Sequence, residues 1–157
     1  MENRGLNKVD LIFETIDSRE VLVKAFSMTS DEIIQQVLES GLKGRGGAGF
    51  PTGLKWKYTA AEKDPEKYIV CNADEGEPGT FKDREILDRA AYKVYGGMAI
   101  AGKAMGARKG FIYLRGEYRF LLPHLYLELH KFHKMIAEIG YDFNIEYRMG
   151  SGAYICG

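Results

Sequence analysis

Apolar residues recur at helical spacing in the segment "MTSDEIIQQVLESG", and this pattern predicts an amphipathic helix. Thr29 is the expected N-cap, Glu32 follows three positions later as in a capping box, and Gly41 ends the helix. Upstream of this helix, the segment "VDLIFETI" (9–16) predicts a short strand. The apolar stripe of the helix consists of Ile33, Ile34, Val37 and Leu38, followed by Leu42.

Two further apolar runs predict buried strands, "YIVCNAD" (68–74) and "GFIYLRG" (110–116), and "FNIEYRM" (143–149) predicts a third strand. Strands that alternate with helices at intervals of roughly 30–40 residues are typical of βαβ units, so we expect an α/β fold with a mainly parallel sheet. Right-handed crossovers predict helices on both faces of this sheet. Ligands of such sheets bind beyond the carboxyl ends of the strands, which here means the loops after Cys71 and after Tyr147.

Helical patterns fill the intervals between the strands. A short helical stretch is expected around 54–63. The segment 82–106 predicts a helix in which Gly96 and Gly97 mark a break or a point of close packing. A long helix is expected over 118–139. Its buried stripe consists of Leu121, Leu125, Leu129, Phe132, Ile136 and Ile139.

Composition narrows the class of protein. The chain has 157 residues, of which 45% are hydrophobic, enough for one domain with its own core. Lys+Arg and Asp+Glu both number 22, and this balance argues against a nucleic-acid partner. The N-terminus lacks the apolar core of a signal peptide, and no apolar run approaches about 18 residues. We therefore expect a cytoplasmic protein without direct membrane insertion.

The two cysteines, Cys71 and Cys156, lie 85 positions apart. A disulfide between them is possible in principle, but two free thiols are favoured in a cytosolic chain. No C-x-x-C motif occurs, so this chain cannot by itself supply the clustered thiolates of an iron–sulfur centre.

The stretch "GLKGRGGAGFPTGLKW" (41–56) contains six glycines and is a candidate for a ligand-binding loop. Residues 44–49 match the dinucleotide pattern G-x-G-x-x-G, but a predicted helix precedes them where that pattern requires a strand. Successive glycines allow positive φ and let backbone N–H groups converge on an anion or a planar ring. Arg45 and Lys55 add positive charge suited to phosphate, and Phe50 and Trp56 add aromatic surface. These aromatic side chains disfavour a mobile linker, so we predict a loop that contacts a ligand.

A second candidate, "NADEGEPGTFKDR" (72–84), follows the first buried strand and is strongly acidic. Carboxylates suit hydrogen-bond donors, such as ribose hydroxyls or the imide N–H of a flavin, and they repel phosphates. The glycine segment would then bind phosphate and the acidic turn a sugar or ring. A calcium loop is disfavoured because its glycine is misplaced. An alternative interpretation is structural: Thr80 or Asp83 caps the next helix.

All three histidines, His124, His130 and His133, lie on the long predicted helix. His130 and His133 could share a metal ion, but no third ligand of a suitable type is evident nearby. Surface or interface histidines are favoured, and no metal site is predicted.

The two candidate stretches, together with "IYLRGEY" and "GSGAYICG" in the same order, resemble the flavoprotein subunit of NADH dehydrogenases. This family includes the NADH-oxidising subunit of respiratory complex I and the equivalent subunits of NAD(P)-linked hydrogenases and formate dehydrogenases. The resemblance runs from about Leu38 to the last residue. It implies a Rossmann-like FMN-binding domain over 37–157, with a mainly parallel sheet flanked by helices, preceded by an N-terminal segment with a helix over 1–36.

The resemblance also implies a site in which NADH stacks on FMN and transfers a hydride to it. Gly44, Gly46 and Lys55 would lie beside FMN, Asn72 and Asp74 would hydrogen-bond the flavin, and Glu77 would hold NADH near its nicotinamide. Phe50 and Tyr58 would be aromatic contacts to NADH, and Tyr154 and Gly157 would pack on the flavin edge. The full candidate set for cofactor binding is Gly44, Arg45, Gly46, Gly47, Gly49, Phe50, Gly53, Lys55, Tyr58, Asn72, Asp74, Glu75, Glu77, Tyr154 and Gly157. No general acid or base is expected, because hydride transfer is the chemistry of the cofactors.

Family members continue beyond "GAYICG" into a paired-glutamate helix, an asparagine-rich segment, a ubiquitin-like insert and a helical domain with a C-x-x-C-x-x-C cluster site. We therefore expect the FMN/NADH domain of this chain to be incomplete at its C-terminus, with little activity alone. Its expected partners are NAD(P)H and other subunits of an oxidoreductase, including a separate C-terminal polypeptide. Its expected location includes a peripheral position on the inner face of a membrane complex. The alternative is a non-catalytic remnant or assembly module that retains the fold without a functional flavin.

Overall fold

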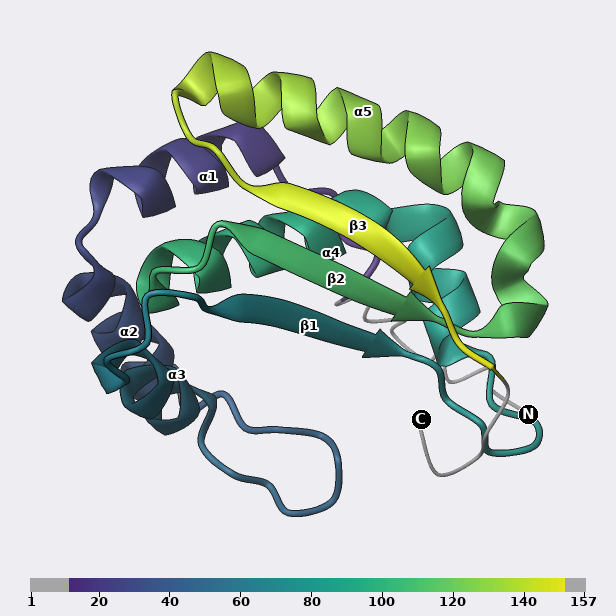
Figure 1. Ribbon diagram of the computed structural model, residues 1–157, viewed down its shortest axis with the longest axis horizontal. Helices are drawn as coiled ribbons and strands as arrows, with labels where there is room; N and C mark the ends of the chain where they lie inside the picture. Colours follow the sequence, from purple (N-terminus) through teal and green to yellow (C-terminus); the bar gives the residue numbers. More distant parts are fainter. Residues whose placement is uncertain (1–11, 152–157) are drawn as a thin grey trace, which may run out of the picture.

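The computed structural model describes residues 12–151 (Figure 1). Helices and strands alternate in the order that the sequence predicts from residue 30 onward. The elements are α1 (Ser18–Ser27), α2 (Ser30–Glu39), α3 (Thr52–Ala61), β1 (Tyr68–Ala73), α4 (Lys82–Met105), β2 (Lys109–Leu114), a 3₁₀ helix η1 (Gly116–Leu121), α5 (Leu122–Ile139) and β3 (Asn144–Met149).

The three strands form one parallel sheet in the order β1-β2-β3. Cys71 lies beside Ile112, and Ile112 lies beside Tyr147, so the strands are in register and end at the same edge of the sheet. Figure 1 shows the three arrowheads together at this carboxyl edge, where the turn after β1 also lies. The predicted α/β fold with a parallel sheet flanked by helices is therefore confirmed.

Only one face of the sheet is covered by helices within residues 12–151. Burial alternates along the strands: Ile69, Ile112 and Ile145 are buried, whereas Val70 on the opposite face is 66% exposed. The predicted helices on both faces are wrong for this part of the chain. The reason is the strand order, because two right-handed crossovers that step in the same direction place both connecting helices on the same face.

Helix α4 packs behind the sheet and bends at an unpredicted position. Its backbone is non-helical at Ala90 (φ −146°, ψ 31°), whereas Gly96 and Gly97 continue the helix, so the break expected at the glycine pair is wrong. A Cβ on Gly96 would lie 3.9 Å from Leu22 Cδ2, an ordinary contact. Close packing occurs instead at Gly102, where a Cβ would lie 2.8 Å from the carbonyl oxygen of Ala107.

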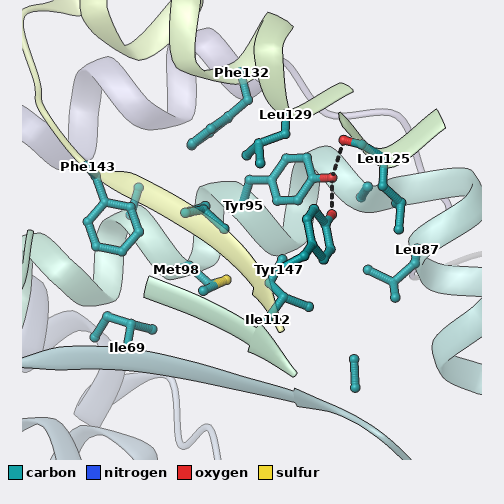
Figure 2. Close-up of a cluster of buried hydrophobic side chains, with 14 of the residues drawn as sticks. Ile69, Leu87, Tyr95, Met98, Ile112, Leu125, Leu129, Phe132, Phe143 and Tyr147 are labelled. Atoms are coloured by element: carbon teal, nitrogen blue, oxygen red, sulfur yellow. Dashed lines mark hydrogen bonds between the residues drawn. The ribbon is translucent and has the colours of Figure 1, made fainter. Parts of the chain in front are cut away.

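The main core lies between the covered face of the sheet and helices α4 and α5 (Figure 2). The fully buried Tyr95 hydroxyl donates to the Leu125 carbonyl oxygen at 3.1 Å and lies 2.6 Å from the Tyr147 hydroxyl. These bonds satisfy polar groups that would otherwise be costly to bury. The predicted stripe of 118–139 is confirmed as the buried face except for the partly buried Ile139, although its first part, up to Leu121, is a 3₁₀ helix.

Predictions for the N-terminal part have mixed outcomes. The capping box of α2 is confirmed, since Thr29 and Glu32 bond each other's backbone N–H groups. Residues 12–16 form no strand, so the described part of the predicted strand 9–16 is wrong, and 9–11 lie outside the described residues. The Lys93 ammonium donates a hydrogen bond to the Ile12 carbonyl oxygen at 2.6 Å. In a β-strand this carbonyl oxygen would instead accept a hydrogen bond from a neighbouring strand.

Candidate functional site

The carboxyl edge of the sheet holds a buried carboxylate directly after β1. Asp74 is only 3% exposed, and its backbone N–H donates to the Asn72 side-chain oxygen at 3.0 Å. Its Oδ2 atom is buried and has no hydrogen-bond partner among the described residues. A buried polar atom without a partner is rare in proteins, and one at the ligand-binding edge of a parallel sheet is suited to accept a hydrogen bond from a ligand.

The chain after β3 reaches the same carboxylate. Gly150 follows β3 and donates its N–H to the Leu114 carbonyl oxygen at 2.7 Å. A Cβ on Gly150 would overlap Asp74 Oδ2 and would lie 2.9 Å from Asp74 Cγ. The loops after β1 and β3 therefore meet at this edge, as predicted. Gly150 itself was not among the predicted site residues.

The remaining side chains of the acidic turn are more exposed than Asp74. Asn72 and Glu77 are exposed, and Glu75 is partly buried. Glu75 accepts the Glu77 backbone N–H at 3.1 Å, and the Lys82 ammonium lies 3.8 Å from the Glu75 carboxylate. The turn thus carries one buried and two more accessible carboxylates within four residues.

The structural role considered for this turn is wrong, because neither Thr80 nor Asp83 caps α4. The N-cap position is Phe81, and no side chain caps the helix there. Asp83 lies inside the first turn of the helix, beyond the capping position, and forms an ion pair with Lys82 at 2.6 Å.

Two residues that sequence reasoning left without a role hold the acidic turn. The Arg115 guanidinium donates to the Glu75 carbonyl oxygen at 2.6 Å and to the Glu117 carboxylate at 2.8 Å. The hydrogen bond from Arg115 holds the pKa of the Glu117 carboxyl below its usual range. The Tyr118 hydroxyl donates to the Thr80 carbonyl oxygen at 3.4 Å. Both residues belong to "IYLRGEY", a motif that supports the family resemblance.

The glycine segment forms a loop that is closed at its base. Lys43 and Pro51 form an antiparallel bridge, and the Gly44 N–H donates to the Phe50 carbonyl oxygen at 2.9 Å. Gly47 (φ 97°) and Gly49 (φ 60°) adopt the left-handed conformation that favours glycine. The segment is therefore a shaped loop rather than an unstructured linker.

The tip of this loop is exposed to solvent. The exposed candidates in the segment are Gly44, Arg45, Gly46, Gly47 and Phe50. In Figure 1 the loop extends from α2 and α3 below β1 toward the side of the carboxyl edge, and its tip remains apart from the acidic turn. Among the described residues, no backbone hydrogen bond joins the glycine loop to the acidic turn. The structure thus brings the residues of the acidic turn together at the carboxyl edge of the sheet, whereas the glycine loop lies apart from them.

The candidates on α3 differ in their surroundings. Gly53 is buried between α2 and α3, where a Cβ would lie 2.8 Å from the Leu38 backbone nitrogen. Lys55 and Tyr58 are exposed, Tyr58 by 60%. Tyr154 and Gly157, the last two candidates, lie outside the described residues.

An open cleft of about 570 Å³ separates α3 from β1 and α4. Lys55 and Trp56 line one side, and Val70, Cys71 and Gly97 line the other. Burial is the main cause that raises the pKa of the Cys71 thiol to about 11, so this thiol is protonated at neutral pH.

His133 is partly buried and links α5 to β3 through a hydrogen bond. Its Nε2 atom accepts the Ile145 backbone N–H at 3.3 Å. Residues 12–151 contain no group of three His, Cys, Asp or Glu side chains that could hold a metal ion. In the same part of the chain, no helix has both the length and the apolar character needed to cross a membrane.

A family model described as the Nuo51 FMN-binding domain matches residues 37–157. The NAD-reducing hydrogenase HoxS subunit alpha of Cupriavidus necator is 47% identical over 148 residues, which cover 90% of this chain and 25% of that protein. The mitochondrial NADH dehydrogenase (ubiquinone) flavoprotein 1 of Dictyostelium discoideum is 45% identical over 135 residues, covering 81% of this chain and 28% of that protein.

A solved structure gives the same relationship. The chain is similar to a crystal structure of an NAD⁺-reducing [NiFe]-hydrogenase in the H₂-reduced state, with a TM-score of 0.83 and 42% identity. The match covers 93% of this chain and 25% of that chain. This chain therefore spans about a quarter of the length of these relatives.

Proposed function

The chain belongs to the Nuo51 FMN-binding domain family, and from this membership we propose that it forms the FMN- and NADH-binding part of an NADH-oxidising flavoprotein. The relatives are subunits of NADH-quinone oxidoreductases and NAD-reducing hydrogenases. We propose that this chain, too, works within a multi-subunit oxidoreductase. In this proposal residues 37–157 carry the nucleotide site, and 1–36 are an N-terminal segment.

The observation that carries the proposal is the buried Oδ2 atom of Asp74, which has no hydrogen-bond partner within residues 12–151. An ionised carboxylate has no proton to donate and can only accept hydrogen bonds. The buried Oδ2 atom therefore requires a hydrogen-bond donor. The imide N–H of an isoalloxazine ring and the hydroxyls of a ribityl chain are such donors. The chemistry of the residues present therefore fits a flavin at the carboxyl edge of the sheet.

The other candidates fit complementary parts of the two nucleotides. The glycine loop offers backbone N–H groups without Cβ atoms, and Arg45 adds a positive charge suited to a phosphate. Exposed Phe50 and Tyr58 offer aromatic surface to the nicotinamide nucleotide. Asn72 and Glu77 would add polar contacts at the edge of the sheet.

When bound, FMN supplies the hydride-accepting chemistry. The residues of the chain bind and orient the two nucleotides and exclude water between them. None of the candidates is required to transfer a proton. The contribution of Asp74 is orientation, because a buried acceptor at a fixed position selects one placement of the donor that it binds.

The proposal is tested by titrating the purified chain with FMN and following the quenching of flavin fluorescence. Saturable binding is expected, with weaker binding of riboflavin because it lacks the phosphate. Addition of NADH should then bleach the visible flavin absorbance. If millimolar FMN gives no saturable quenching, the chain has no flavin site of its own.

A chimera gives a second test in a complete subunit. This chain would replace the matching 148 residues of the HoxS subunit alpha. The proposal expects a flavin-containing protein that oxidises NADH. A chimera that folds and assembles without flavin would instead support a remnant that keeps the fold alone.

A further inference from the structure

The acidic turn after β1 is held at both ends by one short segment of the chain. Near its start, the Arg115 guanidinium donates to the Glu75 carbonyl oxygen at 2.6 Å. At its end, the Tyr118 hydroxyl donates to the Thr80 carbonyl oxygen at 3.4 Å. Arg115 and Tyr118 are only three residues apart, directly after β2. One rigid segment thus spans the opening of the turn.

This segment is itself well fixed. The Arg115 backbone N–H donates to the Ala73 carbonyl oxygen at 3.0 Å, which continues the β1–β2 pairing beyond the Ala73–Leu114 pair to Arg115 itself. Tyr118 is 8% exposed and belongs to the main core. The residues between the two anchor points are less constrained, since Glu77 and Gly79 are exposed and Gly79 has φ 82°.

We propose that Arg115 is a positioning residue that, together with Tyr118, sets the orientation of Asp74 and Glu77 at the nucleotide site. Its effect on nucleotide binding rests on the function proposed above, whereas its effect on the turn does not. Arg115 acts through the Glu75 backbone. Loss of its side chain should let the turn open and should move the Asp74 carboxylate from its buried position.

Arginine suits this role better than lysine. The planar guanidinium donates to a carbonyl oxygen and a carboxylate at once, from two different nitrogen atoms. The Arg115 side chain is 21% exposed, but its partner Glu117 is 58% exposed. An ion pair with so exposed a carboxylate contributes little to stability. The bond to the Glu75 carbonyl is therefore the contact that matters, and Glu117 serves mainly to orient the guanidinium.

Hydrogen exchange in the ligand-free chain tests the clamp directly. Arg115→Ala should raise the exchange rates of the Asp74, Glu77 and Thr80 amides about tenfold, the effect of one lost hydrogen bond, and Ile112 in β2 should be unchanged. Arg115→Lys should fall between Arg115→Ala and the unmodified chain. The matched control is Arg119→Ala, because Arg119 is exposed on the 3₁₀ helix η1 that begins directly after Arg115. Unchanged exchange in Arg115→Ala, or an equal increase in Arg119→Ala, would overturn the proposal.

Fluorescence titration with FMN supplies the second readout. Arg115→Ala should weaken FMN binding about tenfold, and added ethylguanidinium should restore both the binding and the slow exchange. Weakened binding with unchanged exchange would mean that Arg115 contacts the nucleotide directly, which contradicts a positioning role. If the unmodified chain binds no FMN, the proposed function fails, and the exchange experiment still decides whether Arg115 holds the turn.

Discussion

The acidic turn and the glycine loop are both candidate walls of one nucleotide site, yet the structure fixes them to very different degrees. The acidic turn begins with a buried carboxylate and is held by Arg115 and Tyr118. The glycine loop is closed by backbone bonds at its base, and its tip is exposed.

This difference suggests a division of labour between the two regions. A preformed acceptor loses little freedom when it binds a ring, so the acidic turn can define where the flavin lies. An exposed loop of glycines can adapt its N–H groups to a phosphate, at the cost of ordering its backbone. The comparison predicts that changes in the turn will have large effects and that changes in the loop will have small ones.

The largest contrast is expected in thiol reactivity. Burial raises the pKa of Cys71 to about 11, so its reactive thiolate is scarce at pH 8 and becomes abundant only as the pH approaches 11. A cysteine introduced by Ala48→Cys lies at an exposed position of the glycine loop and should react roughly a hundredfold faster at pH 8.

Alkylation by iodoacetamide measures both rates in proteins that each contain a single cysteine. The Cys156→Ser variant retains Cys71 alone, and the Ala48→Cys variant additionally carries Cys71→Ser and Cys156→Ser. Equal rates for the two thiols would show that β1 opens as readily as the loop.

The next contrast compares two glycines. Gly150→Ala places a Cβ against the Asp74 carboxylate and 3.3 Å from the Leu114 carbonyl oxygen. We expect this substitution to lower the free energy of unfolding by about 1–3 kcal/mol, as in overpacked sites, and to weaken FMN binding. Urea denaturation and fluorescence titration measure these effects.

Gly46→Ala is the matched control, because nothing lies within 4 Å of a Cβ at Gly46. Its effect on the free energy of unfolding should stay within about 0.5 kcal/mol. A cost for Gly46→Ala as large as that for Gly150→Ala would mean that the loop is packed as tightly as the turn.

A smaller difference is expected in limited proteolysis. Trypsin should cut after Arg45 roughly tenfold faster than after Lys82, because exposed loop tips open more readily than anchored turns. Mass spectrometry of the first fragments identifies the cut. Saturating FMN should slow cleavage after Arg45 if the loop closes on the phosphate. First cleavage after Lys82 would reverse the order of stability proposed for the two regions.

Local signals account for the parts of the fold that the sequence predicts well. The capping box of Thr29 and Glu32 and the apolar runs of the strands act through neighbouring residues, so their structures follow from short segments. The bend at Ala90 has no comparable signal in the sequence, and nothing in the structure explains it. The open face of the sheet depends on strand order, which element spacing alone does not determine.

The site shows the same limit. Charge and position identify Asp74 as a candidate, but only the structure shows that one of its oxygens is buried without a partner in the described part of the chain. Arg115 acts on a backbone carbonyl 40 positions away, and such a contact leaves no mark in residue spacing. Gly150 matters because the Asp74 carboxylate lies against it, a proximity that depends on the register of β3.

The affinity of the Asp74→Asn variant for FMN, measured by fluorescence titration, tests the central claim most directly. The substitution preserves the shape of the side chain but replaces one carboxylate oxygen with a donor. We predict a roughly 10- to 100-fold loss of FMN affinity, since hydrogen bonds to charged groups contribute about 1.5–3 kcal/mol. Arg45→Gln in the exposed loop should cost less. An Asp74→Asn variant that binds FMN as tightly as the unmodified chain would contradict the account.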